Sequence, residues 1–225
     1  MKEGVYMITY QEIQKNKQIN AYLKKGDQNL GVLGFTDHSN AHTGLVAIRA
    51  SEILKSLDYS SKEQELVKIA GYMHDIGNAI NRVHHAEFGA LLANELLKEV
   101  DIDLEDSVTI VSAIAHHDES TGGATDVISA ALIIADKTDV RRNRVREKER
   151  TAFDIHDRVN YAVTNNHLEI DGQTRTITLK LEIDESICTM FEYFDIFLNR
   201  MLMSRKAAEF LNASFSLVVN GNRVL

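Results

Sequence analysis

The sequence contains no proline in its 225 residues, so each of its helices must end through capping residues, glycine or polar turns. Thr9 with Glu12, and Ser60 with Glu63, match the capping box. In this motif a side-chain oxygen caps the helix start and a glutamate three residues later bonds back to the cap. These start signals, followed by apolar residues at helical spacing, predict a mainly α-helical protein.

Apolar periodicity predicts six helical segments in the first two thirds of the chain. They cover residues 10–25, 38–57, 60–77, 85–100, 103–117 and 127–140, with a loop expected at 26–34. The first segment is polar, and we expect it to pack on the outside. The last is apolar on nearly all sides through Ala135, as expected at the centre of a bundle, and turns charged at Asp136.

The pattern changes after residue 150. A helix predicted at 153–163 is followed by apolar residues that alternate with polar ones around Asp171-Gly172, which predicts a β-hairpin. A long helix at 187–210 and a last strand around Leu217, able to pair with the hairpin, complete this part. We therefore expect a helical domain at 1–150 and a small α+β subdomain at 151–225.

Composition limits the partners and the compartment. The chain has 33 acidic and 25 basic residues and a formal net charge of −8, which argues against general nucleic-acid binding. The N-terminus does not read as a signal peptide, and no stretch approaches the roughly 18 apolar residues of a membrane span. Cys188 is the only cysteine, which suits a reducing compartment. We expect a cytoplasmic protein without a membrane partner.

Histidines carry the main chemical signal. Seven of the nine lie between His38 and His117, and several stand beside other potential metal ligands. His38 and His42 are four residues apart, so a helix capped at Thr36 or Asp37 would place both imidazoles on one face. That geometry can hold one metal or two adjacent ones.

Three further groups stand at predicted helix ends. Consecutive side chains diverge by about 100° around a helix, so His74 and Asp75 can share a metal only near a helix end, which Gly77 supplies. The doublet His116-His117 also ends a helix. Asp136 follows buried apolar residues, where an unpaired charge would cost several kcal/mol, so it needs a cation partner.

Together these residues resemble the signature of the HD superfamily of metal-dependent phosphohydrolases. Members carry a histidine on the first core helix, an adjacent His-Asp pair and a later aspartate after an apolar helix; here these are His42, His74-Asp75 and Asp136. The resemblance covers about residues 36–146 and implies an HD-domain helical bundle. The additional His85, His116-His117 and Ala135-Asp136-Lys137 resemble the expanded site of HD-GYP-type phosphodiesterases.

The resemblance implies two divalent transition metal ions, with Fe, Mn, Zn, Co and Ni left undistinguished. Asp75 would bridge the two ions, and a metal-activated water would hydrolyse a phosphate ester. Asp75 and Lys137 are the implied catalytic residues. The full set of implied metal ligands is His38, His42, His74, Asp75, His85, His116, His117 and Asp136.

Two departures from the HD-GYP pattern bear on the substrate. A chain without proline has no Gly-Tyr-Pro motif, and Asn78 stands where a phosphate-neutralising lysine is usual. Other cations must then bind phosphate, and arginine matches its oxygens bidentately. The candidates are Lys137, Arg141, Arg142 and Arg144. The competing interpretation of this charged run is a solvated helix with surface salt bridges.

The leading hypothesis is hydrolysis of a phosphomonoester or phosphodiester, with a small phosphorylated molecule such as a nucleotide as the substrate. Three alternatives stay open: a cyclic-dinucleotide phosphodiesterase without the usual motif, a di-iron oxygenase of the HD fold, and a non-catalytic module that binds a nucleotide or a metal. The apolar C-terminal helix leaves two further alternatives, a cap over the site and a homodimer surface.

Overall fold

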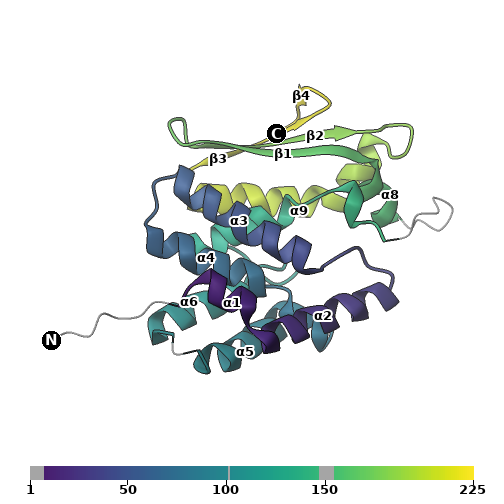
Figure 1. Ribbon diagram of the computed structural model, residues 1–225. Helices are drawn as coiled ribbons and strands as arrows, with labels where there is room; N and C mark the ends of the chain where they lie inside the picture. The colour runs from purple at the N-terminus through teal and green to yellow at the C-terminus, as the bar shows by residue number, and fades with distance from the viewer. Residues whose placement is uncertain (1–7, 101, 147–154) are drawn as a thin grey trace.

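A computed structural model describes residues 8–100, 102–146 and 155–225. A helical bundle lies on one side and a single-layered sheet on the other (Figure 1). Between them runs α9 (Met190–Phe210), which contacts α7 (Val127–Lys137) of the bundle and β3 (Ser214–Val219) of the sheet. The prediction of a mainly helical fold with a small C-terminal α+β part is confirmed.

Seven α-helices form the bundle in the described part of the chain. Besides α7 they are α1 (Tyr10–Lys15), α2 (Lys17–Val32), α3 (Asn40–Ser56), α4 (Ser61–Met73), α5 (His85–Lys98) and α6 (Leu104–Ala115), with short 3-10 turns η1 (Ile76–Ala79) and η2 (Arg142–Arg144). Capping boxes start three of these helices, at Thr9, Ser60 and Asp126. The first two boxes were predicted from the sequence and are confirmed.

The predicted loop at 26–34 is wrong, because α2 continues through it to Val32. Gly26 belongs to this helix for a packing reason. A Cβ atom at Gly26 would stand 3.1 Å from Ala79 N and 3.2 Å from Asn78 Cβ. Glycine therefore lets α2 approach η1 closely, and tertiary contact overrides its usual role as a helix breaker.

The N-terminal arm is part of the core and does not lie outside it. Asn16 ends α1 and its side chain caps α2, so two helices replace the single one expected. Ile13, Ile19 and Leu30 on these helices are fully or almost fully buried. The apolar residues of the arm are few, yet these three are buried against the bundle.

His38 lies before α3, so the expectation that His38 and His42 share one helical face is wrong. Ser39 caps α3, while Asp37 accepts hydrogen bonds from the backbone N–H and hydroxyl of Ser39. The His38 N–H donates to Asp27 Oδ1 on α2 at 3.0 Å. His38 therefore lies in a loop, and a hydrogen bond to α2 holds this loop in place.

A tight crossing at Gly77 brings the start of α5 against η1. A Cβ atom at Gly77 would overlap the His85 carbonyl oxygen and lie 2.5 Å from Gly89 N. The crossing sets His85 beside Asp75, with His85 Nε2 at 3.6 Å from Asp75 Oδ1.

Replacing Gly77 with alanine should therefore lower the free energy of unfolding by about 1–3 kcal/mol, because backbone has to move to admit the methyl group. In a chain of this size that corresponds to a fall in melting temperature of about 2–4 °C per kcal/mol. Gly123→Ala is the control, since a Cβ atom there meets nothing within 4 Å. Equal melting temperatures for both variants would contradict the close approach.

The C-terminal sheet has the strand order β1-β2-β3-β4. β1 (Val163–Asp171) and β2 (Thr176–Ile183) form an antiparallel hairpin, and β3 pairs with β2 in parallel. The short β4 (Asn222–Arg223) pairs antiparallel with β3. The predicted hairpin and last strand are confirmed, and α9 makes the crossover that a parallel pair requires.

Two details differ from the sequence prediction. The hairpin turn contains four residues, Gly172 to Arg175, with Arg175 at a φ of 50°. β1 also begins earlier than expected, directly after α8 (Ile155–Ala162). Asn166 in this first part of β1 donates to the carbonyl oxygens of Thr138 and Val140, so a bond to the bundle stabilises a polar strand.

Buried side chains of the bundle and the sheet form one continuous core. The boundary predicted at residue 150 and the helix start predicted at 153 fall within 147–154, outside the described residues. In the ranges that are described, no helix is both long and apolar enough to cross a membrane.

Candidate metal centre

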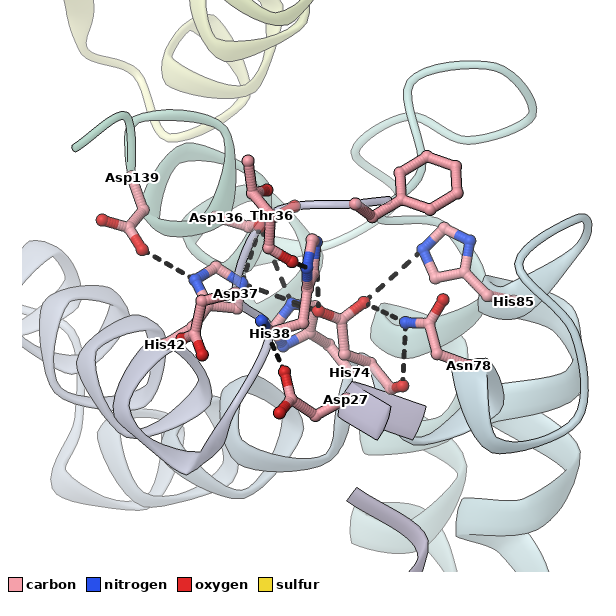
Figure 2. A network of polar contacts seen from close by, with 12 residues as sticks. Asp27, Thr36, Asp37, His38, His42, His74, Asn78, His85, Asp136 and Asp139 are labelled. Carbon is pink, nitrogen blue, oxygen red and sulfur yellow. Dashed lines mark hydrogen bonds and ion pairs between the residues drawn. The ribbon is translucent and has the colours of Figure 1, made fainter. Parts of the chain in front are cut away.

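Imidazoles and carboxylates from separate elements meet where several helix ends converge (Figure 2). α3 supplies His42, the end of α4 supplies His74 and Asp75, and α7 supplies Asp136. The remaining members are His38 from the loop before α3, His85 from the start of α5 and His117 from the end of α6. Seven of the eight predicted ligands therefore gather in one place.

Two groups among the described residues can each hold a metal ion. His42, His74 and Asp136 form the first, and His74, Asp75 and His117 the second; in each, the ligand atoms lie within 4.8 Å of one another. His74 belongs to both groups. His42 Nε2 lies 3.4 Å from Asp136 Oδ1, and His74 Nε2 lies 3.3 Å from Asp75 Oδ2.

Each imidazole is oriented by a hydrogen bond through Nδ1. The acceptors are oxygens that cannot donate, so Nδ1 carries the proton in each ring. The pairs are His38 with Thr36 O, His42 with Asp139 Oδ2, His74 with Gly71 O and His117 with Ile114 O, all at 2.7 Å, and His85 with Arg82 O at 3.1 Å. In a neutral ring, every Nε2 then offers a lone pair.

Several of these lone pairs have no protein partner. Across the described residues, His42 Nε2, His74 Nε2 and Asp75 Oδ2 are buried without a hydrogen bond. His85 Nε2 faces His117 Nε2 at 3.2 Å, an arrangement of two lone pairs that is unfavourable unless a cation lies near. Buried acceptors of this kind are costly in isolation, so the donor set fits bound metal cations.

The electrostatics also favour a cation. Burial, together with the nearby His74 and His85, lowers the pKa of His117 to about 3. Burial also lowers the pKa values of His38 and His85, which keeps these rings neutral. At His74 burial acts in the same direction, but Asp75 and Asp136 outweigh it and raise the pKa to about 10. The centre therefore stabilises a positive charge at His74 Nε2.

Asp75 stands between the two sides of the cluster. Its Oδ2 lies 3.6 Å from His42 Nε2 and 4.0 Å from His38 Nε2, whereas its Oδ1 lies 3.6 Å from His85 Nε2. Asn78 fixes this orientation, because its amide donates to Asp75 Oδ1 at 2.9 Å. Asn78, which stands where HD-GYP-type enzymes usually carry lysine, thus orients the Asp75 carboxylate.

His116 is the predicted ligand that the structure does not bring to the cluster. Its Nδ1 donates to Ser112 O at 2.9 Å, and it belongs to neither group found in the described ranges. Its neighbour His117 occupies the site, and two consecutive side chains at the end of a helix point in different directions. Nearby Asp118 Oδ2 lies 3.2 Å from His85 Nδ1.

Asp139 is a site residue that the sequence interpretation missed. It is fully buried and accepts from His42 Nδ1 at 2.7 Å. Burial opposes the charge of its carboxylate, but His42 and Arg144 hold its pKa well below the usual range. An aspartate three residues after a proposed ligand was the available signal. Asp136 lies at the end of α7, and Asp139 lies just beyond it, with its N–H donating to Asp136 O at 3.0 Å.

Replacing Asp139 with asparagine should weaken metal binding by about 10- to 100-fold, because a negative partner makes a ligating imidazole more basic. Competition with a chelator measures the metal dissociation constant. Asp106→Asn is the matched control, since Asp106 is also buried but pairs with Lys62. An unchanged dissociation constant for Asp139→Asn would show that His42 needs no charged partner.

Lys137 lies between two carboxylates. Its Nζ is 2.7 Å from Asp136 Oδ2 and 2.7 Å from Glu119 Oε2, and Arg200 Nε donates to Glu119 Oε1 at 3.0 Å. Lys137 is only 5% exposed. Its charge is therefore committed to two acids, and its role in binding a substrate phosphate stays a prediction.

A pocket of about 410 Å³ opens beside the cluster, and His38 and Arg144 contribute to its wall. Arg82 and Arg200, which the sequence analysis did not single out, also line it. Arg82 comes from the loop before α5 and Arg200 from α9. The basic residues around this pocket therefore belong to segments far apart in the sequence.

Arg141 and Arg142, two predicted phosphate ligands, line a different pocket beside Asn165. Arg141 pairs with Asp139. Arg142 Nε donates to Tyr161 O at 2.5 Å, and its guanidinium carbon lies 4.5 Å from the centre of the Tyr161 ring. Arg142 is thus directed toward α8, Arg141 reaches the metal centre only through Asp139, and Arg144 lines the pocket beside the cluster.

Comparison with known proteins identifies the family of this chain. The HD domain family matches residues 41–184. An uncharacterized protein of Methanocaldococcus jannaschii is 28% identical over 177 residues, which cover 68% of each chain. A crystal structure of a predicted HD superfamily hydrolase from an uncultured Thermotogales bacterium is 23% identical, with a TM-score of 0.44, and the match covers 60% of this chain and 75% of that one.

The family match spans more than half of the chain and contains His42, the His74-Asp75 pair and Asp136. These are the residues that the sequence resemblance identified and that the structure brings together. The chain belongs to the HD domain family.

Proposed function

We infer that this protein is a metal-dependent hydrolase that cleaves phosphate esters at a centre with two metal ions. The observation that carries the proposal is the set of buried ligand atoms without a protein partner, His42 Nε2, His74 Nε2 and Asp75 Oδ2. Membership of the HD domain family and the two overlapping ligand groups support it.

The ligand types point to transition metals. Imidazole nitrogen combined with carboxylate oxygen suits Fe, Mn, Co, Ni or Zn, whereas Mg²⁺ and Ca²⁺ prefer sites made of oxygen alone. His42, His74 and Asp136 would hold one ion and His74 or Asp75 with His85 and His117 the other. Asp75 is the residue whose two oxygens face both sides, so it is the proposed bridge.

A bound pair of such ions supplies a water of lowered pKa and neutralises charge on phosphoryl oxygens. The protein's own residues orient the ligands: Asp139 holds His42, and Asn78 holds Asp75. Lys137 keeps Asp136 fixed and ionised. Arg82 and Arg144 lie at the pocket wall beside His38, where their guanidinium groups can bind the oxygens of the ester.

The metal content of the protein tests the proposal. Elemental analysis of protein purified without chelator or added metal should give about two transition metal ions per chain. With that metal, hydrolysis of p-nitrophenyl phosphate or bis-p-nitrophenyl phosphate separates monoester from diester activity. One ion per chain would leave the smaller site of His42, His74, Asp75 and Asp136. No metal, with no uptake of Mn, Fe or Zn, would overturn the proposal.

A further inference from the structure

Three arginines from three separate elements line the pocket beside the metal centre: Arg82, Arg144 and Arg200. The chain as a whole carries a net charge of −8, so a group of cations around one pocket departs from its general composition. The pocket also contains His38, whose Nε2 lies 4.0 Å from Asp75 Oδ2. Among the residues that line it, His38 is the one proposed metal ligand, so the pocket meets the cluster at His38.

Two of these arginines rest on aromatic rings in the same pocket. The Arg82 guanidinium carbon lies 5.4 Å from the centre of the Phe35 ring, and that of Arg200 lies 5.0 Å from the centre of the Phe197 ring. Contact with a ring face holds a guanidinium group in place and leaves its N–H edge available for an anion.

The acids in the pocket cancel only part of this charge. Glu119 pairs with Lys137 and Arg200, and Lys137 also pairs with Asp136, so these four side chains are neutral together. If Asp136 binds a metal ion, as proposed, the other three side chains keep a net positive charge. Asp157, the other acid in the wall, has an interaction partner of its own. Arg82 has no carboxylate partner within the described ranges, and its NH1 contacts Asn78 Oδ1 and His85 Nε2, both at 3.4 Å.

One phosphate at the metal centre would use only part of this set. Arg82 reaches a proposed ligand directly, through His85 Nε2. Arg200 is linked to the centre through Glu119, which also pairs with Lys137, and the Nε of Arg200 is already used by Glu119. The outer N–H groups of Arg200 are the ones left to bind a second anionic group within about 410 Å³.

We propose that the pocket selects a bisphosphorylated small molecule, with one phosphate at the metal centre and a second phosphate bound by Arg200. This proposal rests on the proposed function for the first phosphate. A charge-assisted hydrogen bond to arginine contributes about 1.5–3 kcal/mol, which makes the expected gain from the second phosphate about tenfold or more in affinity.

Phosphonates test this without turnover, because the carbon–phosphorus bond replaces the ester. Calorimetry on the metal-loaded, dialysed protein compares propylphosphonate with ethane-, propane- and butane-bisphosphonate, so that several distances between the two anions are covered. At least one bisphosphonate should bind about tenfold more tightly than propylphosphonate. A preference below about twofold at all three lengths would overturn the proposal, whether or not the protein hydrolyses p-nitrophenyl phosphate.

Variants of two arginines on α9 locate the second phosphate. Arg200→Met should remove most of the tenfold preference, whereas Arg205→Met, an exposed arginine on the same helix, should keep it. Arg200→Lys should retain an intermediate preference, since it keeps the charge but not the planar fork. A loss of affinity for both phosphonates with the ratio unchanged would mean that Arg200 acts only on Glu119, and would overturn its assignment.

Discussion

Replacing Asp75 with alanine is expected to lower phosphate-ester hydrolysis by at least about 1,000-fold, which corresponds to about 4 kcal/mol of transition-state stabilisation. The reason is its place between the two ligand groups, with Oδ2 toward His42 and His74 and Oδ1 toward His85. Among the described residues, the other carboxylate of the two ligand groups is Asp136, which is already shared with Lys137.

The same variant should lose the stabilisation that metal gives to the fold. A ligand present at about 1,000 times its dissociation constant stabilises a folded protein by about 4 kcal/mol, so metal should raise the melting temperature of the wild type but not of Asp75→Ala. Asp106→Ala, which removes a buried aspartate outside the centre, should respond to metal like the wild type. A rate and metal content equal to those of the wild type would refute the site.

Local sequence patterns were sufficient for most helices. Thr9 and Ser60 each begin a helix with a capping box, formed by their own side chain and a glutamate three residues later. Four consecutive residues are therefore enough to predict the start of each helix. Gly26 is a residue whose structure local patterns do not predict. Its place within α2 depends on the approach of Asn78 and Ala79 from a distant segment, and a local pattern cannot contain that contact.

The gathering of the proposed metal ligands was predictable because their residue types are rare together and stand at helix ends. His42, His74, Asp75, His85, His117 and Asp136 all meet, although His38 arrives from a loop and not from the predicted helix. The choice between His116 and His117 depends on the last turn of α6, where a rotation of about 100° separates the two side chains. Sequence spacing cannot resolve that rotation.

The residues of the pocket were harder to predict than the ligands. Arg200 stands in a 21-residue helix among aromatic and aliphatic side chains, and nothing around it indicates a site. It reaches the centre because α9 packs on α7, which lets it bind Glu119. Arg141 and Arg142 were predicted to bind phosphate because they follow Asp136 closely in sequence. This proximity did not determine the direction of their side chains. Arg141 lies just before η2 and Arg142 is its first residue, and both line another pocket.

Lys137 was expected to be catalytic, and its surroundings predict a large structural effect as well. Its ammonium group is buried between Asp136 and Glu119. Burial opposes its charge, yet these two acids outweigh burial and raise its pKa, so it is a cation at neutral pH. Removing one member of a buried ion pair leaves the remaining charge without compensation, which costs about 3–5 kcal/mol.

In chelator-treated protein, Lys137→Met should therefore lower the free energy of unfolding by about 3–5 kcal/mol, as measured by urea denaturation. Lys62→Met is the matched control, because Lys62 also pairs with an aspartate at 2.7 Å but is 54% exposed. Its loss should cost about 1 kcal/mol or less.

Two additions separate the structural contribution of Lys137 from a catalytic one. Glu119→Gln combined with Lys137→Met removes one of the two carboxylates that Lys137 pairs with. Because Glu119 also pairs with Arg200, this second change should recover only a small part of the stability. Added metal should recover more, since Asp136 would then face a cation on its Oδ1 side, where His42 Nε2 lies at 3.4 Å. If the doubly substituted, metal-loaded protein is stable but inactive, Lys137 is needed for the reaction itself; if activity returns with stability, Lys137 serves to hold Asp136 in place.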